Sequence, residues 1–116
     1  MKYIALIYTA PDAGPKPDTP EFGAMMGGYQ KAGEVFSADG VFVAGEPLES
    51  TANATSLRVR GGKVETMDGP FAETKEQLGG FYMFDCDTLD DALRYAAMIP
   101  SAEFGTIEVR PIMNFG

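Results

Sequence analysis

Apolar runs and amphipathic stretches follow one another along this chain in an order that few folds can accommodate. Runs typical of strands occupy residues 3–8, 41–44, 55–60, 63–67, 81–86 and 105–111. Amphipathic stretches typical of helices separate the first two runs and the last two. The predicted order is therefore strand, helix, strand, hairpin, strand, helix, strand.

This order predicts an α+β fold, a ferredoxin-like sandwich with an added β-hairpin. Two strand–helix–strand units would form a mostly antiparallel sheet with both helices on one face. A second copy of the chain is the simplest cover for the other face, so we expect a homodimer with two-fold symmetry. The first run, Tyr3–Tyr8, is continuously apolar and fits a strand buried on both faces.

The first helix is expected to begin at Pro20, with Asp18 or Thr19 as its N-cap, and to end near residues 39–40. Its apolar stripe repeats at spacings of three and four: Phe22, Met25, Tyr29, Ala32 and Phe36. Glycines at positions 23, 27, 28 and 33 lie within it, and each costs about 1 kcal/mol relative to Ala. They either admit a close neighbour or make the helix irregular, and the unbroken stripe favours the close neighbour.

Two further elements have clear local signals. Alternating residues predict a hairpin from Thr55 to Met67 that turns at Gly61–Gly62. The second helix is expected to begin at Asp87–Thr88 and to stop before Pro100. Its expected buried stripe is Leu89, Ala92, Leu93 and Ala96.

Composition narrows the function classes. The 116 residues fit a single domain, residues 1–116, with 9 basic and 17 acidic side chains and a net charge of −8. Such an acidic chain repels phosphate backbones and anionic lipid surfaces, so we expect neither a nucleic-acid partner nor a membrane partner. The acidic balance by itself indicates only solubility.

The numbers of cysteine and histidine residues exclude further kinds of site. The chain has one cysteine, Cys86, and no histidine, so neither an internal disulfide nor a zinc site is expected. Cys86 lies in an apolar run and is interpreted as a buried, inert thiol. The apolar N-terminal run is short and is interpreted as a strand, not a signal peptide. A cytoplasmic location and no cofactor are the corresponding expectations.

The densest concentration of unusual residues is the segment from Asp68 to Gly80. It begins with Asp-Gly-Pro, ends with Gly-Gly, and carries Glu73, Lys75 and Glu76 between apolar neighbours. Loops of this kind often carry function. The segment resembles the signature of the DGPF proteins, a branch of the YCII-related family, and the resemblance extends to residues 1–3, 44–48 and 107–112.

The resemblance implies a dimeric α/β barrel in which the sheets of two ferredoxin-like subunits face each other. It implies little about activity, although the wider family includes a dehydrochlorinase of chlorinated hydroxyquinols, and its members are thought to use a His–Asp pair. Some DGPF genes adjoin those of extracytoplasmic-function sigma factors. This chain has no histidine, and the corresponding helix position falls near Gly28, so the His–Asp chemistry does not transfer.

The candidate catalytic residues are therefore Glu73, Lys75 and Glu76, assisted by Asp68. A carboxylate desolvated in a cleft would serve as a general base. The structural alternatives are a turn role for Asp68 and a local ion pair or solvated turn for the other three. These alternatives are favoured by about two to one for the charged loop.

Two further residues are candidates for substrate binding. Arg110 can clamp an anion, or can pair with Glu108, as Arg58 can with Glu65. Glu46 follows a strand, where site residues are frequent, but is equally compatible with a solvated position. The tyrosines, including Tyr29 and Tyr82, are interpreted as core aromatics with a polar tip.

Two functions remain open. The first is a small cofactor-free enzyme with a pocket in a dimeric α/β barrel, acting on a small aromatic or carbonyl-bearing metabolite. The second is a non-catalytic ligand-binding or regulatory module with a link to an extracytoplasmic-function sigma factor. The absence of histidine favours the second function, whereas the charged loop and the family resemblance favour the first.

Overall fold

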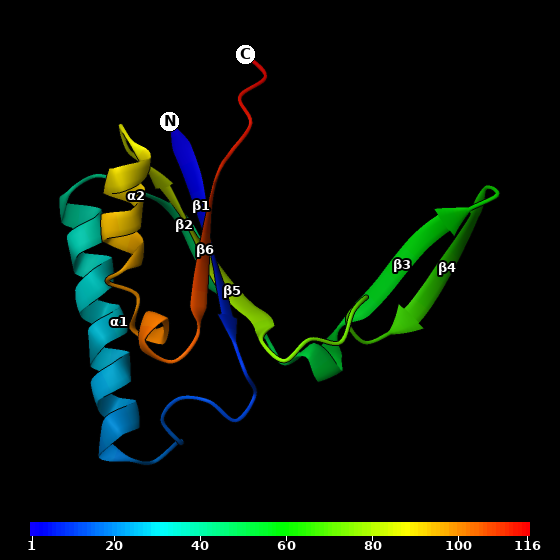
Figure 1. Ribbon diagram of the computed structural model, residues 1–116, viewed down its shortest axis with the longest axis horizontal. Helices are drawn as coiled ribbons and strands as arrows, with labels where there is room; N and C mark the ends of the chain where they lie inside the picture. The colour runs from blue at the N-terminus through cyan, green and yellow to red at the C-terminus, as the bar shows by residue number, and fades with distance from the viewer.

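Four antiparallel strands form the main sheet in the computed structural model, which describes residues 1–116 (Figure 1). These strands are β1 (Lys2–Thr9), β2 (Phe42–Pro47), β5 (Gln77–Asp85) and β6 (Thr106–Pro111), in the order β2-β5-β1-β6. Helices α1 (Pro20–Ala38) and α2 (Leu89–Ala96) both lie on one face of the sheet. This arrangement is consistent with the predicted ferredoxin-like α+β fold, and the single chain forms no closed barrel.

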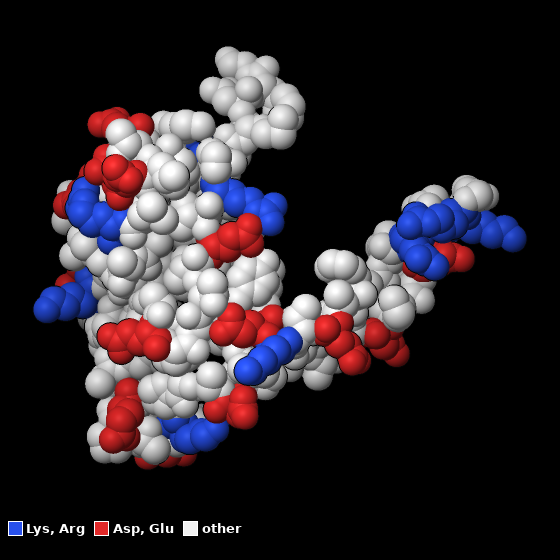
Figure 2. All heavy atoms as spheres, viewed as in Figure 1, with Lys and Arg blue, Asp and Glu red and all other residues white.

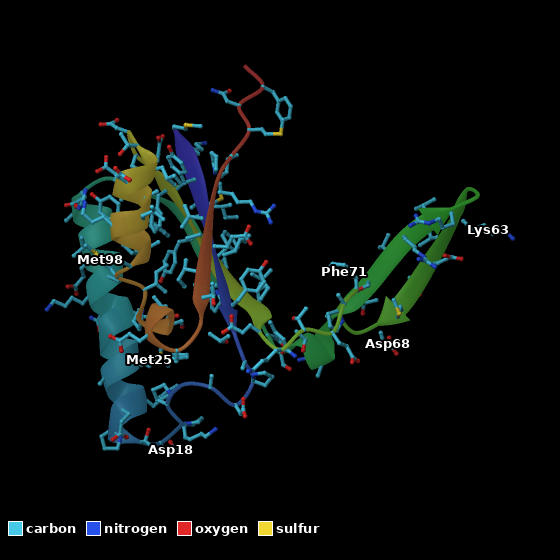
Figure 3. The ribbon with its side chains drawn as sticks, viewed as in Figure 1. Asp18, Met25, Lys63, Asp68, Phe71 and Met98 are labelled. Carbon is cyan, nitrogen blue, oxygen red and sulfur yellow. The ribbon has the colours of Figure 1, made fainter.

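The predicted hairpin is confirmed and stands away from the sheet. Strands β3 (Thr55–Arg60) and β4 (Lys63–Asp68) pair only with each other and form what we call the hairpin arm, residues 55–68. Gly61 and Gly62 have φ angles of 57° and 77°, which a two-residue turn requires. Lys63 lies at the tip and Asp68 at the base (Figure 3), and basic side chains gather at the tip (Figure 2).

Several boundaries differ from the sequence prediction. Thr19, not Asp18, caps α1, because its hydroxyl accepts the N–H of Phe22 at 3.2 Å. Strand β2 continues to Pro47, which is tolerated because β2 is an edge strand. Strand β5 begins at Gln77, four residues earlier than expected, since backbone pairing with β1 and β2 extends through its glycines.

The core lies between the sheet and the two helices, with Phe36 at its centre. The ring of Phe36 is fully buried. Its centroid lies 5.3 Å from that of Tyr82, 4.8 Å from that of Phe84 and 5.9 Å from that of Tyr95, each in edge-on geometry. Buried residues from β1, α1, α2 and the connecting segments complete one cluster: Tyr3, Ala5, Ile7, Ala32, Val41, Cys86, Ala92, Ala96 and Ile99.

The opposite sheet face is uncovered in the single chain. On β1, Tyr3, Ala5 and Ile7 are buried against the helices, but Ile4, Leu6 and Tyr8 are only half-buried. The prediction that β1 is buried on both faces is therefore not met within one chain. Ile4 and Leu6 lie opposite Met83 and Phe81 of β5, so the middle of this open face is apolar.

Helix α2 has its predicted cap, and the N–H of Asp91 donates to the Thr88 hydroxyl at 3.1 Å. Its predicted stripe is wrong in part, because Leu89 and Leu93 are exposed while Ala92, Tyr95 and Ala96 are buried.

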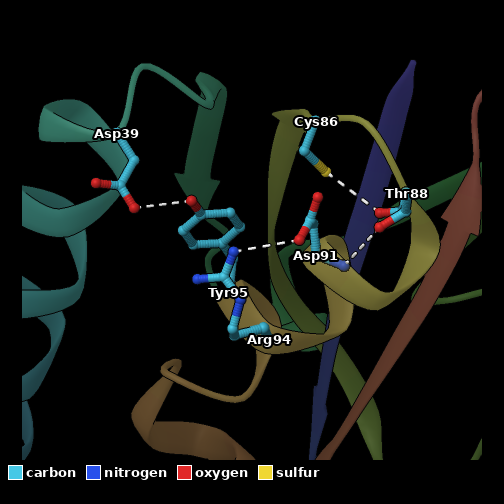
Figure 4. Close-up of polar contacts among 6 residues, drawn as sticks. All are labelled: Asp39, Cys86, Thr88, Asp91, Arg94 and Tyr95. Atoms are coloured by element: carbon cyan, nitrogen blue, oxygen red, sulfur yellow. Dashed lines mark hydrogen bonds and ion pairs between the residues drawn. The ribbon is translucent and has the colours of Figure 1, made fainter.

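Tyr95 explains why α2 buries this face and not the one that carries Leu89 and Leu93 (Figure 4). Its ring packs against Phe36, and its hydroxyl donates to Asp39 Oδ2 at 2.7 Å. Arg94 lies over the Tyr95 ring, 4.6 Å from the centroid, and pairs with Asp91 at 3.2 Å.

The glycines of α1 fit the close-approach interpretation at one position only. A Cβ on Gly28 would lie 3.0 Å from Cγ of Pro100, whereas Cβ atoms on Gly23, Gly27 and Gly33 would meet nothing within 4 Å. At the other three positions, packing does not require glycine, because a side chain there would contact nothing. No helix combines the length and apolar character that a membrane span requires.

We expect the protein to lose stability at alkaline pH. Burial raises the pKa of the Cys86 thiol and of the Tyr82 phenol, and the hydrogen bond to Asp39 raises the pKa of the Tyr95 phenol. The folded state therefore holds more protons than the unfolded state above about pH 8.5, where an unperturbed thiol titrates. The free energy of unfolding should fall from there onward, and urea titrations at pH 7, 9 and 10.5 measure it.

The Cys86→Ala variant separates the contribution of the thiol to this pH dependence from that of the two phenols. Without the thiol, the decline should begin only near the ordinary tyrosine pKa of about 10. A free energy of unfolding that stays constant or rises up to pH 10.5 would contradict the assignment.

Candidate functional site

A cavity of about 380 Å³ lies between α1 and one end of the sheet. We call it the tyrosine pocket, because Tyr29 of α1 and Tyr82 of β5 both line it. Its apolar wall includes Ile7 and Met26. Apolar walls with a few polar groups are typical of small-molecule sites.

A pair of hydroxyl groups forms the polar part of the pocket. The Tyr29 hydroxyl and the Ser101 hydroxyl share a hydrogen bond of 2.5 Å. Ser101 belongs to a short 3-10 helix, η2 (Pro100–Glu103), and is only 6% exposed. Because Gly28 has no side chain, Pro100 can approach α1, and this approach brings Ser101 to Tyr29.

Tyr82 supplies a third hydroxyl to the lining. Its ring crosses β2 at Gly45, where a Cβ would lie 2.7 Å from Cδ1 of the ring, so only glycine fits without movement. Burial, and secondarily the neighbouring Tyr29, raise the pKa of the Tyr82 phenol. The phenol is therefore neutral at physiological pH and can donate a hydrogen bond.

Glu46 is the one acidic residue in the lining, but it is paired with Phe81, so its exposed side chain lies on the open sheet face and not beside the hydroxyls. It is also the one sequence-predicted site residue that the structure brings to this pocket. The chemistry of the pocket therefore comes from its three hydroxyls, which can hold an oxygen atom of a bound molecule.

The charged loop is arranged differently. Asp68 ends the hairpin arm, Glu73 and Lys75 are exposed, and none of the three forms an ion pair. Glu76 is half-buried, and its Oε1 accepts a hydrogen bond from the Thr106 hydroxyl at 2.7 Å. The structure therefore does not gather these four side chains at one point, and their catalytic role stays a prediction.

A second cavity, of about 490 Å³, lies beside this loop. Tyr8, Phe71 and Thr74 are among its lining residues, whereas Asp68, Glu73, Lys75 and Glu76 are not. Phe71 is 88% exposed and lies at the base of the hairpin arm (Figure 3). Several hydroxyls line this cavity, but those of Thr51, Ser56 and Thr74 already donate to Gln77, to the Gly69 carbonyl and to the Glu76 carbonyl. These hydroxyls hold the surrounding loops together.

Arg110 lies on the open sheet face, where it forms an ion pair with Glu108 of the same strand. This hydrogen bond raises the pKa of the Arg110 guanidinium. Arg58 pairs with Glu65 across the hairpin arm at 3.0 Å. Both arginines thus have the structural pairing that was the alternative to anion binding, and Arg110 is not among the residues that line the tyrosine pocket.

Sequence reasoning missed Ser101 and ranked Tyr29 and Tyr82 as core aromatics. The available signal was Tyr29 itself, because a phenol on the buried stripe of a helix needs a hydrogen-bond partner. No group of three or more His, Cys, Asp or Glu side chains is placed to hold a metal ion.

The topology and the pocket define an α+β protein with a hydroxyl-lined cavity at one end of its sheet. Residues 1–116 match the model of the YCII-related domain, and the chain belongs to this family. An uncharacterized protein of Rhizobium meliloti (strain 1021) is 51% identical over 67 residues, which are 56% of this chain and 54% of that protein. The chain thus spans about half the length of this curated relative.

Proposed function

We propose that this chain is a small cofactor-free enzyme of the DGPF branch and that the tyrosine pocket is its site. The substrate class is a small aromatic or carbonyl-bearing compound. The observation that carries the proposal is the Tyr29–Ser101 hydroxyl pair at 2.5 Å, beside the neutral phenol of Tyr82 in a largely apolar cavity. Hydroxyl donors in an apolar cavity suit a carbonyl or phenolic oxygen, since they stabilise negative charge that develops on it.

The reaction type is proton transfer next to that oxygen. The hydroxyls of Tyr29, Ser101 and Tyr82 would hold the oxygen in place, and water at the mouth of the pocket would take or return the proton. The charged loop residues Glu73, Lys75 and Glu76 have no part in this step.

The proposed assembly is a homodimer in which the open sheet faces of two copies meet and form the α/β barrel. The half-buried Ile4, Leu6, Phe81 and Met83 support this proposal, because they make the uncovered face apolar. A solution mass equal to that of one chain would contradict it.

The binding site is tested by a thermal-shift screen of small phenols and aromatic carbonyl compounds. A ligand present at 100 times its Kd stabilises the folded protein by about 2.7 kcal/mol. Replacing Tyr29 with Phe or Ser101 with Ala removes one hydrogen-bonding group. The affinity for a hit should then fall about 2- to 13-fold, which corresponds to about 0.5–1.5 kcal/mol for one hydrogen bond.

Tyr95→Phe is the matched control, since it also removes a buried phenolic hydroxyl but lies outside the pocket. It should leave the affinity unchanged. Equal affinity of the wild-type, Tyr29→Phe and Ser101→Ala proteins for every hit would refute the proposed site.

The alternative function is a non-catalytic regulatory module, linked to an extracytoplasmic-function sigma factor. The exposed apolar residues of the hairpin arm support it, because they suit a protein partner. Turnover of a bound ligand by the purified protein favours the enzyme, whereas binding without turnover across the screen favours the module.

A further inference from the structure

The hairpin arm is an amphipathic element without a partner in its own chain. Leu57, Val59 and Val64 are 65%, 53% and 65% exposed. Pairing across the arm places Val59 opposite Val64 and Leu57 opposite Thr66, so these side chains share one face. Arg58 and Glu65 are paired on the other face.

Such an arm is not stable by itself. An isolated two-stranded hairpin is marginally stable in water at best, and this arm shares no strand pairing with the sheet. The radius of gyration of the chain is 16.2 Å, whereas about 13 Å is typical for a compact domain of this length. The radius is large because the arm projects from the body, and Figure 2 shows the open hollow between them.

The charge of the arm differs from that of the body. The arm carries three basic and two acidic residues, so the remaining residues have a net charge of −9 within the total of −8. Arg60 and Lys63 lie directly opposite each other at the tip, and neither has an ion-pair partner in the chain. Both side chains lie on the Arg58 face of the arm, opposite Val59 and Val64, and give the arm a net positive charge that an acidic molecule attracts.

We propose that the arm of each protomer packs its apolar face on the body of a second copy of this chain, alongside the contact between the open sheet faces. The net positive arm is attracted at long range by the acidic body of the second copy, while Arg60 and Lys63 lie on the Arg58 face and stay in solvent. This inference rests on the proposed dimer and names the part of the chain that holds it together.

The area that a stable dimer must bury supports a second copy of the chain as the partner of the arm. Four strands of about 20 Å give an open face of about 400 Å², so two facing sheets bury roughly 800 Å². A stable interface needs about 1,200–2,000 Å². Two arms, each covering about 200 Å² and shielding the same area beneath, add roughly 800 Å² and bring the total into that range.

Two variants at adjacent positions test the role of the apolar face. Leu57 and Arg58 are both well exposed in the chain, and their side chains point to opposite faces of the arm. Sedimentation equilibrium should show that Leu57→Ser weakens dimerisation at least about tenfold, because each dimer loses two buried leucines. Arg58→Ser should change the dissociation constant by less than about threefold. Equal effects of the two variants would overturn the proposal.

Hydrogen exchange of the wild-type protein provides a readout that does not depend on variants. Amides of residues 55–68 should be protected at concentrations where the protein is dimeric and should lose protection as dilution dissociates it. A dimer whose arm exchanges freely would overturn this inference and leave the facing-sheet dimer intact. A wild-type protein that is monomeric at every concentration would overturn both.

Discussion

Replacing Phe36 with Ala is expected to lower the free energy of unfolding by about 3–5 kcal/mol. Phe36 is 0% exposed, and three aromatic rings surround it within 6 Å between centroids. Its removal leaves a cavity that these rings can fill only by leaving their present positions. Because a domain is typically stable by about 5–15 kcal/mol, this single change can remove most of the stability.

Urea denaturation followed by circular dichroism measures the loss, and Phe115→Ala is the control. Phe115 is 90% exposed, so its removal should change stability by no more than about 0.5 kcal/mol. A loss below about 1 kcal/mol for Phe36→Ala would mean that the aromatic cluster is not the centre of the core.

Replacing Gly105 with Ala is expected to destabilise the protein by about 1–3 kcal/mol or more, because it overpacks a site that cannot expand. A Cβ at this position would lie 2.3 Å from the backbone oxygen of Tyr8 and 2.7 Å from Cγ2 of Thr9. The obstructing oxygen belongs to β1, which pairs with β5 and β6 on its two sides. Relief would require a shift of the central strand or of the turn before β6.

A Gly→Ala substitution is expected to stabilise the protein at a position where the structure has room for the added methyl group. Gly23 lies in α1, and an added Cβ meets nothing within 4 Å. Gly23→Ala should therefore stabilise the protein by about 0.4–1 kcal/mol, since Ala favours the helix and restricts the unfolded chain. Thermal or urea unfolding of both variants checks the pair, and a shift of the same sign in both would contradict the packing described for these positions.

Local patterns account for most of the fold. The period-two alternation and the Gly61–Gly62 turn were sufficient for the hairpin, and the order of elements was sufficient for the α+β arrangement. The start of β5 could not be found in this way, because Gly79 and Gly80 have no pattern and are strand residues only through their neighbours. The orientation of α2 was missed because Tyr95, not Leu89 or Leu93, occupies the space beside Phe36.

The candidate site is mostly a product of tertiary structure. Tyr29 and Ser101 are 72 positions apart, so no local motif joins them. Glu46 could be proposed from its place at a strand end, but its pairing with Phe81 turns its side chain to the open face, so only its backbone borders the pocket. The charged loop stood out by composition, but composition does not determine which side chains face a cavity.

The central claim is that the tyrosine pocket binds the ligand, and an amide NMR titration tests it most directly. The strongest hit from the screen is added to nitrogen-15-labelled protein, and the backbone amide shifts are followed to saturation. We predict that the largest changes occur at Gly45, Gly80 and Ser101, which line the pocket. Largest changes at residues 70–76 or in the hairpin arm, with these three amides unmoved, would contradict the claim.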